Sequence, residues 1–134
     1  VGYIDAALVG PPGILVLRVA DYEGRLLNEA GRWLIANKKG EWKSFFANPT
    51  KEVIDDIKHL RAYLIAQNLP DDLPLFGVVV FVKDDPIAHL TIKDPVILAT
   101  HLSSLPMRLQ GNYLAKERIP PKAVAAVVRL LYGE

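Results

Sequence analysis

One stretch of the chain limits its fold more than any other, because it is apolar from end to end. The run from Phe76 to Val82 lacks the alternation of apolar and polar residues that marks a strand with one face in water. Such a run is typical of a strand covered on both faces, and we predict a central strand of an α/β domain. The run is far shorter than the roughly 20 residues of a membrane span, so we expect no membrane contact.

Breaker residues divide the first part of the chain into short strands. Two aliphatic stretches, Tyr3 to Val9 and Ile14 to Val19, enclose a Gly-Pro-Pro-Gly turn, which predicts a hairpin. Three shorter candidates follow Gly24 and are separated by glycine and by an Asn-Lys-Lys-Gly turn: Arg25 to Leu27, Arg32 to Ala36 and Glu41 to Phe46. We expect these three to form an antiparallel meander that opens a mixed sheet.

Helix signals begin at Asn48-Pro49, since asparagine is a favoured N-cap and proline is tolerated in the first helical turn. Apolar residues then recur at helical spacing, which predicts a helix from about Thr50 to Gln67 that packs on the sheet. Four further elements are weaker: strands at Ala88 to Ile92 and Val96 to Ala99, and helices at Thr100 to Gln110 and Pro121 to Tyr132.

Composition narrows the classes of protein that remain. The 134 residues suit a single domain, and the absence of cysteine excludes disulfides and thiolate metal sites. A net charge of +1 excludes a global field that would attract a polyanion, so any nucleic-acid contact needs a local basic patch. The chain begins at Val1 with no visible targeting leader, and we expect a cytoplasmic protein whose true start is missing from the sequence.

Several short motifs follow one another between Tyr3 and Phe81. In chain order they are Ile4-Asp5 with Leu8-Val9-Gly10, Gly13 to Leu17, Gly24, Trp33, Asn48-Pro49 and Gly77 to Phe81. No single motif is specific, but their order and spacing resemble those of the nuclease-related domain family, a branch of the restriction-endonuclease-like superfamily. The resemblance implies one α/β domain over residues 1–134, with a mixed β-sheet, an antiparallel meander and flanking helices. It also implies that the family's N-terminal helix is absent here.

The resemblance implies a metal site that this chain has largely lost. In the family, an Asp of the first strand and a Glu-x-Lys of the second bind a divalent metal and orient the attacking water. Asp5 matches the first element, but the Glu position holds Arg18 and the Lys position holds Ala20. A guanidinium cannot ligate a metal and repels a cation. The family's Gln after Asn-Pro is Glu52 in this sequence.

Each candidate residue also has a structural interpretation. Asp5 is either a metal ligand left from the family's site or an aspartate that bonds a turn. Arg18 either contacts phosphate or forms an ion pair. Glu52 either interacts favourably with the dipole of its helix or forms a displaced metal site with Asp5. In the displaced site, Asp5 and Glu52 would hold Mg²⁺ and Arg18 would stand in for the missing Lys. If the chain is not a nuclease, we expect no cofactor.

Two other groups of residues are of types that can bind metals or nucleic acids. The three histidines, His59, His89 and His101, show no metal-ligand spacing and receive no role. Lys38, Lys39 and Lys43 lie near Trp33 and Trp42 in the sequence, a combination that suits a nucleic-acid surface. A solvated hairpin with core tryptophans is the competing and favoured interpretation.

Three hypotheses for function follow. The favoured one is a degenerate, non-catalytic nuclease-related domain that is retained to bind nucleic acid, such as DNA, or another partner. The second is a Mg²⁺-dependent DNA nuclease with the displaced site. The third is a self-association module that forms a homo-oligomer, which the high hydrophobic fraction of 51% favours. For the structure, we expect Arg18 to point toward the same region as Asp5 and the start of the Asn48-Pro49 helix.

Overall fold

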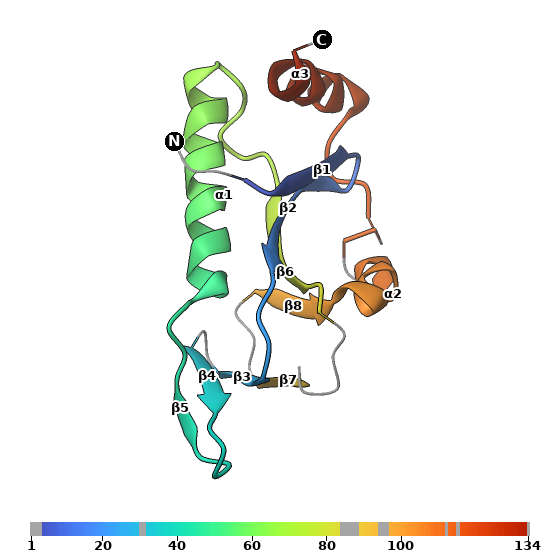
Figure 1. The fold of residues 1–134 in the computed structure, drawn as a ribbon. Coiled ribbons are helices and arrows are strands. Elements are labelled where there is room, and N and C mark those ends of the chain that lie inside the picture. Colours follow the sequence, from blue (N-terminus) through green and yellow to red (C-terminus); the bar gives the residue numbers. More distant parts are fainter. Residues whose placement is uncertain are drawn as a thin grey trace.

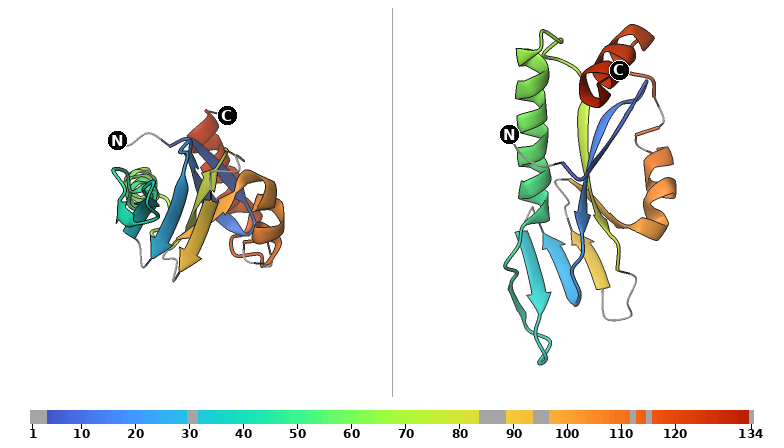
Figure 2. Two further views of the ribbon diagram at one scale, coloured as in Figure 1. Left: turned by 60° about the horizontal axis from the view of Figure 1, so that its bottom comes forward. Right: turned by 45° about the horizontal axis from the view of Figure 1, so that its top comes forward.

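The computed structural model describes residues 4–29, 32–83, 89–93, 97–111, 113–114 and 116–133. Within them, strands and helices form an α/β arrangement in which α1 separates the first five strands from the later three, shown from three sides in Figures 1 and 2. The elements are β1 (Ala6–Gly10), β2 (Gly13–Ala20), β3 (Arg25–Glu29), β4 (Arg32–Ala36), β5 (Trp42–Ser44), α1 (Pro49–Ala66), β6 (Leu75–Phe81), β7 (His89–Lys93), β8 (Leu98–His101), the 3-10 turn η1 (Leu102–Ser104), α2 (Leu105–Gly111) and α3 (Pro121–Tyr132). None of the helices in the described part of the chain is long and apolar enough to span a bilayer.

The apolar run forms the central strand that the sequence predicts. The first sheet has the order β1-β2-β6-β8, in which β1 and β2 form an antiparallel hairpin and β2, β6 and β8 run parallel. From Val78 to Phe81, every residue of β6 is at most 4% exposed. Helix α1 covers one face of this sheet and α2 covers the other (Figure 1). The prediction of a strand covered on both faces is therefore confirmed.

Residues of β2 alternate between these two layers. Ile14, Val16 and Ala20 belong to the same buried cluster as Val53 of α1, whereas Leu15 packs with Leu109 of α2. A strand presents successive side chains to opposite faces, so position 18 must also face α1. This alternation is the local reason why a charged residue of β2 meets the helix.

Helix α1 lies unusually close to the sheet at Gly77. A Cβ built on Gly77 would come within 2.8 Å of Cδ1 of Ile57 and 3.1 Å of Cγ2 of Val53. Glycine lets the helix approach the strand at this distance without displacing the Ile57 and Val53 side chains. The start of the helix matches the prediction, because the Asn48 side chain accepts a hydrogen bond from Lys51 N at 3.0 Å and Pro49 occupies the first turn.

The meander does not open the first sheet but forms a second one. Its order is β5-β4-β3-β7, with antiparallel pairs from β5 to β3 and a parallel pair between β3 and β7. The chain leaves β2 at Ala20 and turns at Gly24, which has a φ of 106°, before β3 begins. The second sheet lies beyond one end of the first sheet (Figure 1). At that end, β2 finishes and α1 begins.

Two element boundaries differ clearly from the predictions. The first strand begins at Ala6, since Asp5 bends away and bonds a neighbouring strand, while Tyr3 lies outside the described residues. Thr100 extends β8 instead of starting a helix, because it pairs with Val80 in the parallel ladder. The predicted starts at Ala88 and Val96 fall outside the described residues. The last helix spans the predicted range.

Candidate functional site

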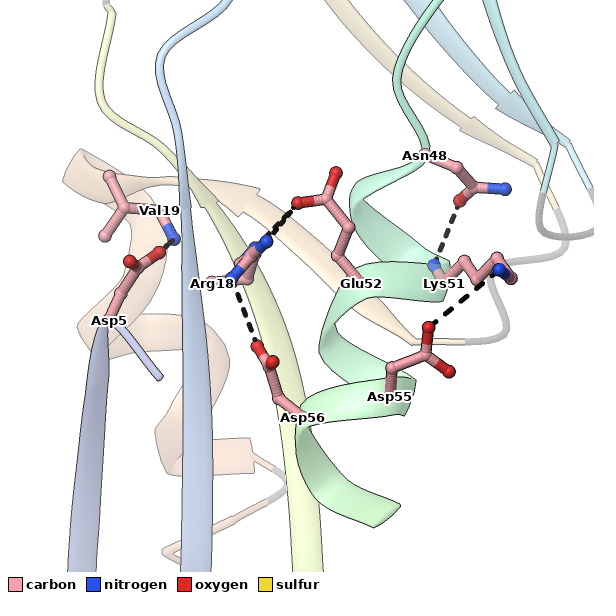
Figure 3. A network of polar contacts seen from close by, with 8 residues as sticks. All are labelled: Asp5, Arg18, Val19, Asn48, Lys51, Glu52, Asp55 and Asp56. Atoms are coloured by element: carbon pink, nitrogen blue, oxygen red, sulfur yellow. Dashed lines mark hydrogen bonds and ion pairs between the residues drawn. The ribbon is translucent and has the colours of Figure 1, made fainter. Parts of the chain in front are cut away.

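The candidate site lies where β2 approaches the first two turns of α1 (Figure 3). Capping by Asn48 fixes the first turn of the helix, which contains Glu52. Asp56 follows four residues later and so lies on the same helix face, one turn further along. Because position 18 of β2 faces this helix, Arg18 reaches both carboxylates.

Arg18 makes two ion pairs with the helix. Its Nε donates to Oε2 of Glu52 at 2.9 Å, and its Nη2 contacts the same oxygen. Its Nη1 donates to Oδ2 of Asp56 at 3.3 Å. The exposed fraction of the side chain is 22% for Arg18, 36% for Glu52 and 7% for Asp56. The guanidinium therefore lies between one half-exposed and one buried carboxylate.

Charge and burial shift the pKa values of this group. The hydrogen bond from Arg18 to Glu52 raises the pKa of the guanidinium, burial opposes the shift, and the charges of Glu52, Asp56 and Asp5 add to it. Burial raises the pKa of the Asp56 carboxyl, although the charge of Arg18 acts against the shift. The loss of hydration at Asp56 thus outweighs the attraction of its partner.

Asp5 lies next to this group but is bound differently. Its Oδ2 accepts a hydrogen bond from the backbone N of Val19 at 2.8 Å, so it bonds the strand residue that follows Arg18 (Figure 3). Its charge is still close enough to raise the pKa of Arg18. The prediction that Arg18 points toward the start of α1 is confirmed, and Asp5 lies beside it with a structural bond of its own.

Asp56 was missed by reasoning from the sequence, although a signal was present. The apolar stripe of α1 includes Val53, Leu60 and Leu64, each at most 5% exposed. Asp56 lies within that stripe, at three and four residues from its neighbours Val53 and Leu60. A carboxylate on the buried face of a helix needs a partner, and Arg18 is the charged residue on the facing strand. Pairing these two positions would have identified the site.

The other candidates occupy separate places. Asp21 and Glu23, which follow β2, both pair with Lys83, at 3.5 Å and 2.8 Å. Trp33 is a core residue with 4% exposure, and its Nε1 donates to Oγ1 of Thr50 at 2.8 Å. Trp42 is 40% exposed, so only one of the two tryptophans fits the core interpretation. The structure does not describe the side chain of His89.

A divalent metal does not fit the side chains around Arg18. Glu52 and Asp56 both direct an oxygen at the guanidinium, and a cation placed between them would meet that positive charge. Asp5 directs its Oδ2 at a backbone N–H. In the ranges that the structure describes, no three His, Cys, Asp or Glu side chains gather closely enough to hold a metal.

Comparisons with known proteins give one match. The family model described as "Nuclease-related domain" matches residues 1–82, which is more than half of the chain and includes β1 to β6 and α1. Neither a curated protein nor a solved structure matches the chain. The matched region contains Arg18, Glu52 and Asp56, which together are called the Arg18 group.

Proposed function

This chain belongs to the nuclease-related domain family, and from that membership we propose that it is a non-catalytic member that binds nucleic acid. One observation carries the first half of the proposal: the Arg18 guanidinium bridges Glu52 and Asp56. A nuclease of this class needs carboxylates that are free to hold a metal. Here the Arg18 cation already occupies an oxygen of both Glu52 and Asp56.

Loss of the proton-transfer group supports the same conclusion. The position that the resemblance gives to a catalytic Lys is Ala20, whose side chain is buried at 2% exposure and carries no titratable group. Arg18 cannot replace that Lys as a base, because a guanidinium keeps its proton at any ordinary pH, and the ion pair with Glu52 raises its pKa further. Metal binding and water activation are thus both impaired.

The intact fold supports the binding half of the proposal. Helix α1 still packs on the first sheet through a dry cluster that includes Ile14, Val16 and Val53, all 0% exposed. A domain that has lost its catalytic groups but keeps a complete core can still present a surface. Family membership makes nucleic acid the first ligand to test.

The experiment measures cleavage and binding separately. Plasmid and linear DNA are incubated with the protein and Mg²⁺ or Mn²⁺, with a chelator as the blank, and cleavage is followed on gels. Asp5→Ala and Glu52→Gln are the matched variants. We expect no cleavage above the blank from the parent or either variant. If the parent cuts DNA and either substitution abolishes the cutting, a displaced site of Asp5 and Glu52 is correct and the non-catalytic proposal fails.

Binding is tested by fluorescence anisotropy with labelled single-stranded and duplex DNA and RNA at several salt concentrations. We expect saturable binding of at least one probe, weakened by salt as phosphate contacts require. Absence of binding to every probe at low salt would overturn the nucleic-acid half of the proposal. Light scattering on the same sample would then show whether the chain associates with itself instead.

A further inference from the structure

Charge is distributed unevenly between the candidate site and the second sheet. Around the site, Arg18 is held by Glu52 and Asp56, and Lys51 lies near Asp55. With Asp5, these make four carboxylates against two bases, a net charge of −2. A phosphate backbone would be repelled from this region.

The meander has the opposite sign. Residues 25–46 contain five basic residues, Arg25, Arg32, Lys38, Lys39 and Lys43, and two acidic residues, Glu29 and Glu41. Their net charge is therefore +3, although the whole chain carries only +1. Among the described residues, no salt bridge joins Lys38, Lys39 or Lys43 to a carboxylate. The meander is the local basic patch that nucleic-acid binding by a nearly neutral chain requires.

The strand register gives the meander two different faces. Leu26 pairs with Ile35, and both pack against the buried cluster that contains Trp33. Ala36 pairs with Trp42 on the opposite face, because successive residues of a strand alternate. Trp33 is 4% exposed and Trp42 is 40% exposed, which identifies the face of Trp42 as the outer one.

An aromatic ring and a guanidinium lie together on that outer face. The Arg25 guanidinium carbon is 6.0 Å from the centroid of the Trp42 ring, with β3 and β5 on either side of β4. Both an indole and a guanidinium offer a flat surface on which an unpaired base can stack. A duplex hides the faces of its bases, so this pair favours a single strand.

The turn between β4 and β5 supplies charge beside the ring. The Asn37 side chain holds this turn, since its Oδ1 accepts from the backbone N of Lys39 and of Glu41, both at 2.9 Å. Lys38 and Lys39 are exposed at its tip, where the hairpin projects from the rest of the molecule (Figure 2). Both ammonium groups can therefore contact phosphates without disturbing the fold.

We propose that single-stranded nucleic acid binds the outer face of β3 to β5, with a base stacked on Trp42 and Arg25 and the phosphates along Lys38 and Lys39. The inference rests on the proposed nucleic-acid function and places the binding surface on the meander, away from the Arg18 group. Stacking supplies affinity without requiring a particular base, and the lysines supply the salt-dependent part.

The experiment uses labelled single-stranded DNA and RNA and a matching duplex, with affinity measured by anisotropy. Trp42→Ala should weaken single-strand binding about tenfold, as expected for loss of one stacked base. Trp42→Phe should keep most of the affinity. The control is Tyr63→Ala on α1, whose side chain has a similar exposure of 37% and which should leave binding unchanged.

The salt dependence tests the lysines independently. Lys38→Ala with Lys39→Ala should reduce the slope of log affinity against log salt by about 1.4, because each lost phosphate contact on a single strand contributes about 0.7. Lys58→Ala with Lys122→Ala removes the same charge elsewhere and should not change the slope as much. These lysines are exposed, so the double variant keeps the test valid even if Trp42→Ala fails to fold.

Other outcomes separate the two proposals. If the parent binds no probe, the proposed function itself fails. If the parent binds and neither the Trp42 nor the lysine variants differ from their controls, the function stands and the meander surface is wrong. Preference for the duplex over both single strands would also overturn the inference, since a paired base cannot stack on Trp42.

Discussion

At the scale of single residues, Arg18 is the side chain on which the charge balance of the site depends. Its removal would leave Asp56, 7% exposed, as a buried carboxylate without its cation. We expect Arg18→Met to lower the free energy of unfolding by about 2 kcal/mol, in the range for loss of one partner of a partly buried charged pair. Urea denaturation measures the change.

A second substitution provides the control for this prediction. Adding Asp56→Leu to Arg18→Met removes the unpaired carboxylate, and the double variant should recover much of the lost stability, because an apolar pair of suitable size can replace a buried ion pair. Equal stability of the parent and Arg18→Met would contradict the prediction.

The pKa of Asp56 predicts how its contribution to stability depends on pH. Burial raises this pKa above the ordinary value of 3.8, so the folded state binds the proton more tightly than the unfolded state. The stabilising contribution is therefore complete below pH 3.8 and is lost as the pH rises through the folded pKa. Relative to Asp56→Asn, which does not titrate, the parent should lose stability over this range.

Thermal melts of the parent and Asp56→Asn between pH 3 and 7 measure the difference. A parent that gains stability relative to the variant as the pH rises would mean that Arg18 lowers the pKa of Asp56 more than burial raises it, and the prediction would be wrong.

At the scale of elements, the contact between α1 and β6 depends on Gly77. A Cβ at this position would lie 2.8 Å from Cδ1 of Ile57, closer than atoms in a packed core approach. We expect Gly77→Ala to destabilise the protein by about 1–3 kcal/mol through overpacking. Combining it with Ile57→Val removes the clashing methyl and should restore part of the loss. A Gly77→Ala variant as stable as the parent would show that the helix shifts freely.

Local patterns in the sequence predicted the individual helices and strands better than they predicted how the strands pair into sheets. Asn48 and the apolar spacing of α1, and the unbroken apolar run of β6, are properties of neighbouring residues, and both elements formed as expected. The separate second sheet depends on the pairing of β3 with β7, more than 60 residues apart in the sequence, and no local pattern encodes that choice.

The same distinction holds at the candidate site. The resemblance drew attention to Arg18 and Glu52, which the structure brings into contact. Asp56 was overlooked because its role depends on a partner 38 residues away. Asp5 was interpreted as a metal ligand left from the family's site or as an aspartate that bonds a turn, but its bond to Val19 N depends on the bend before β1, which the sequence did not reveal.

At the scale of the whole molecule, one core joins the two sheets. The largest buried cluster contains Leu26 and Trp33 of the second sheet together with Ile14, Val53 and Phe81. The hydrogen bond from Trp33 to Thr50 adds a polar link to α1. Shared burial of this kind makes the two sheets lose their structure together.

We therefore expect the protein to unfold in one cooperative step. In a Trp42→Phe background, fluorescence reports on Trp33 alone, at the junction of the sheets, while far-UV circular dichroism reports on the helices. The two urea transitions should coincide within error. A fluorescence transition at clearly lower urea would mean that the second sheet unfolds on its own.

Because Arg18 pairs with Glu52 and Asp56, the counter-charge at this end of the domain does not depend on the concentration of a metal ion. A bound metal obeys mass action and leaves its site when its concentration falls below the dissociation constant. A guanidinium attached to the backbone has no such constant, so the cation between Glu52 and Asp56 is present at one copy per chain from synthesis onward. Thermal midpoints measured with chelator and with millimolar Mg²⁺ should accordingly be the same. Glu52 and Asp56 therefore keep the same counter-charge at every metal concentration that leaves the protein folded.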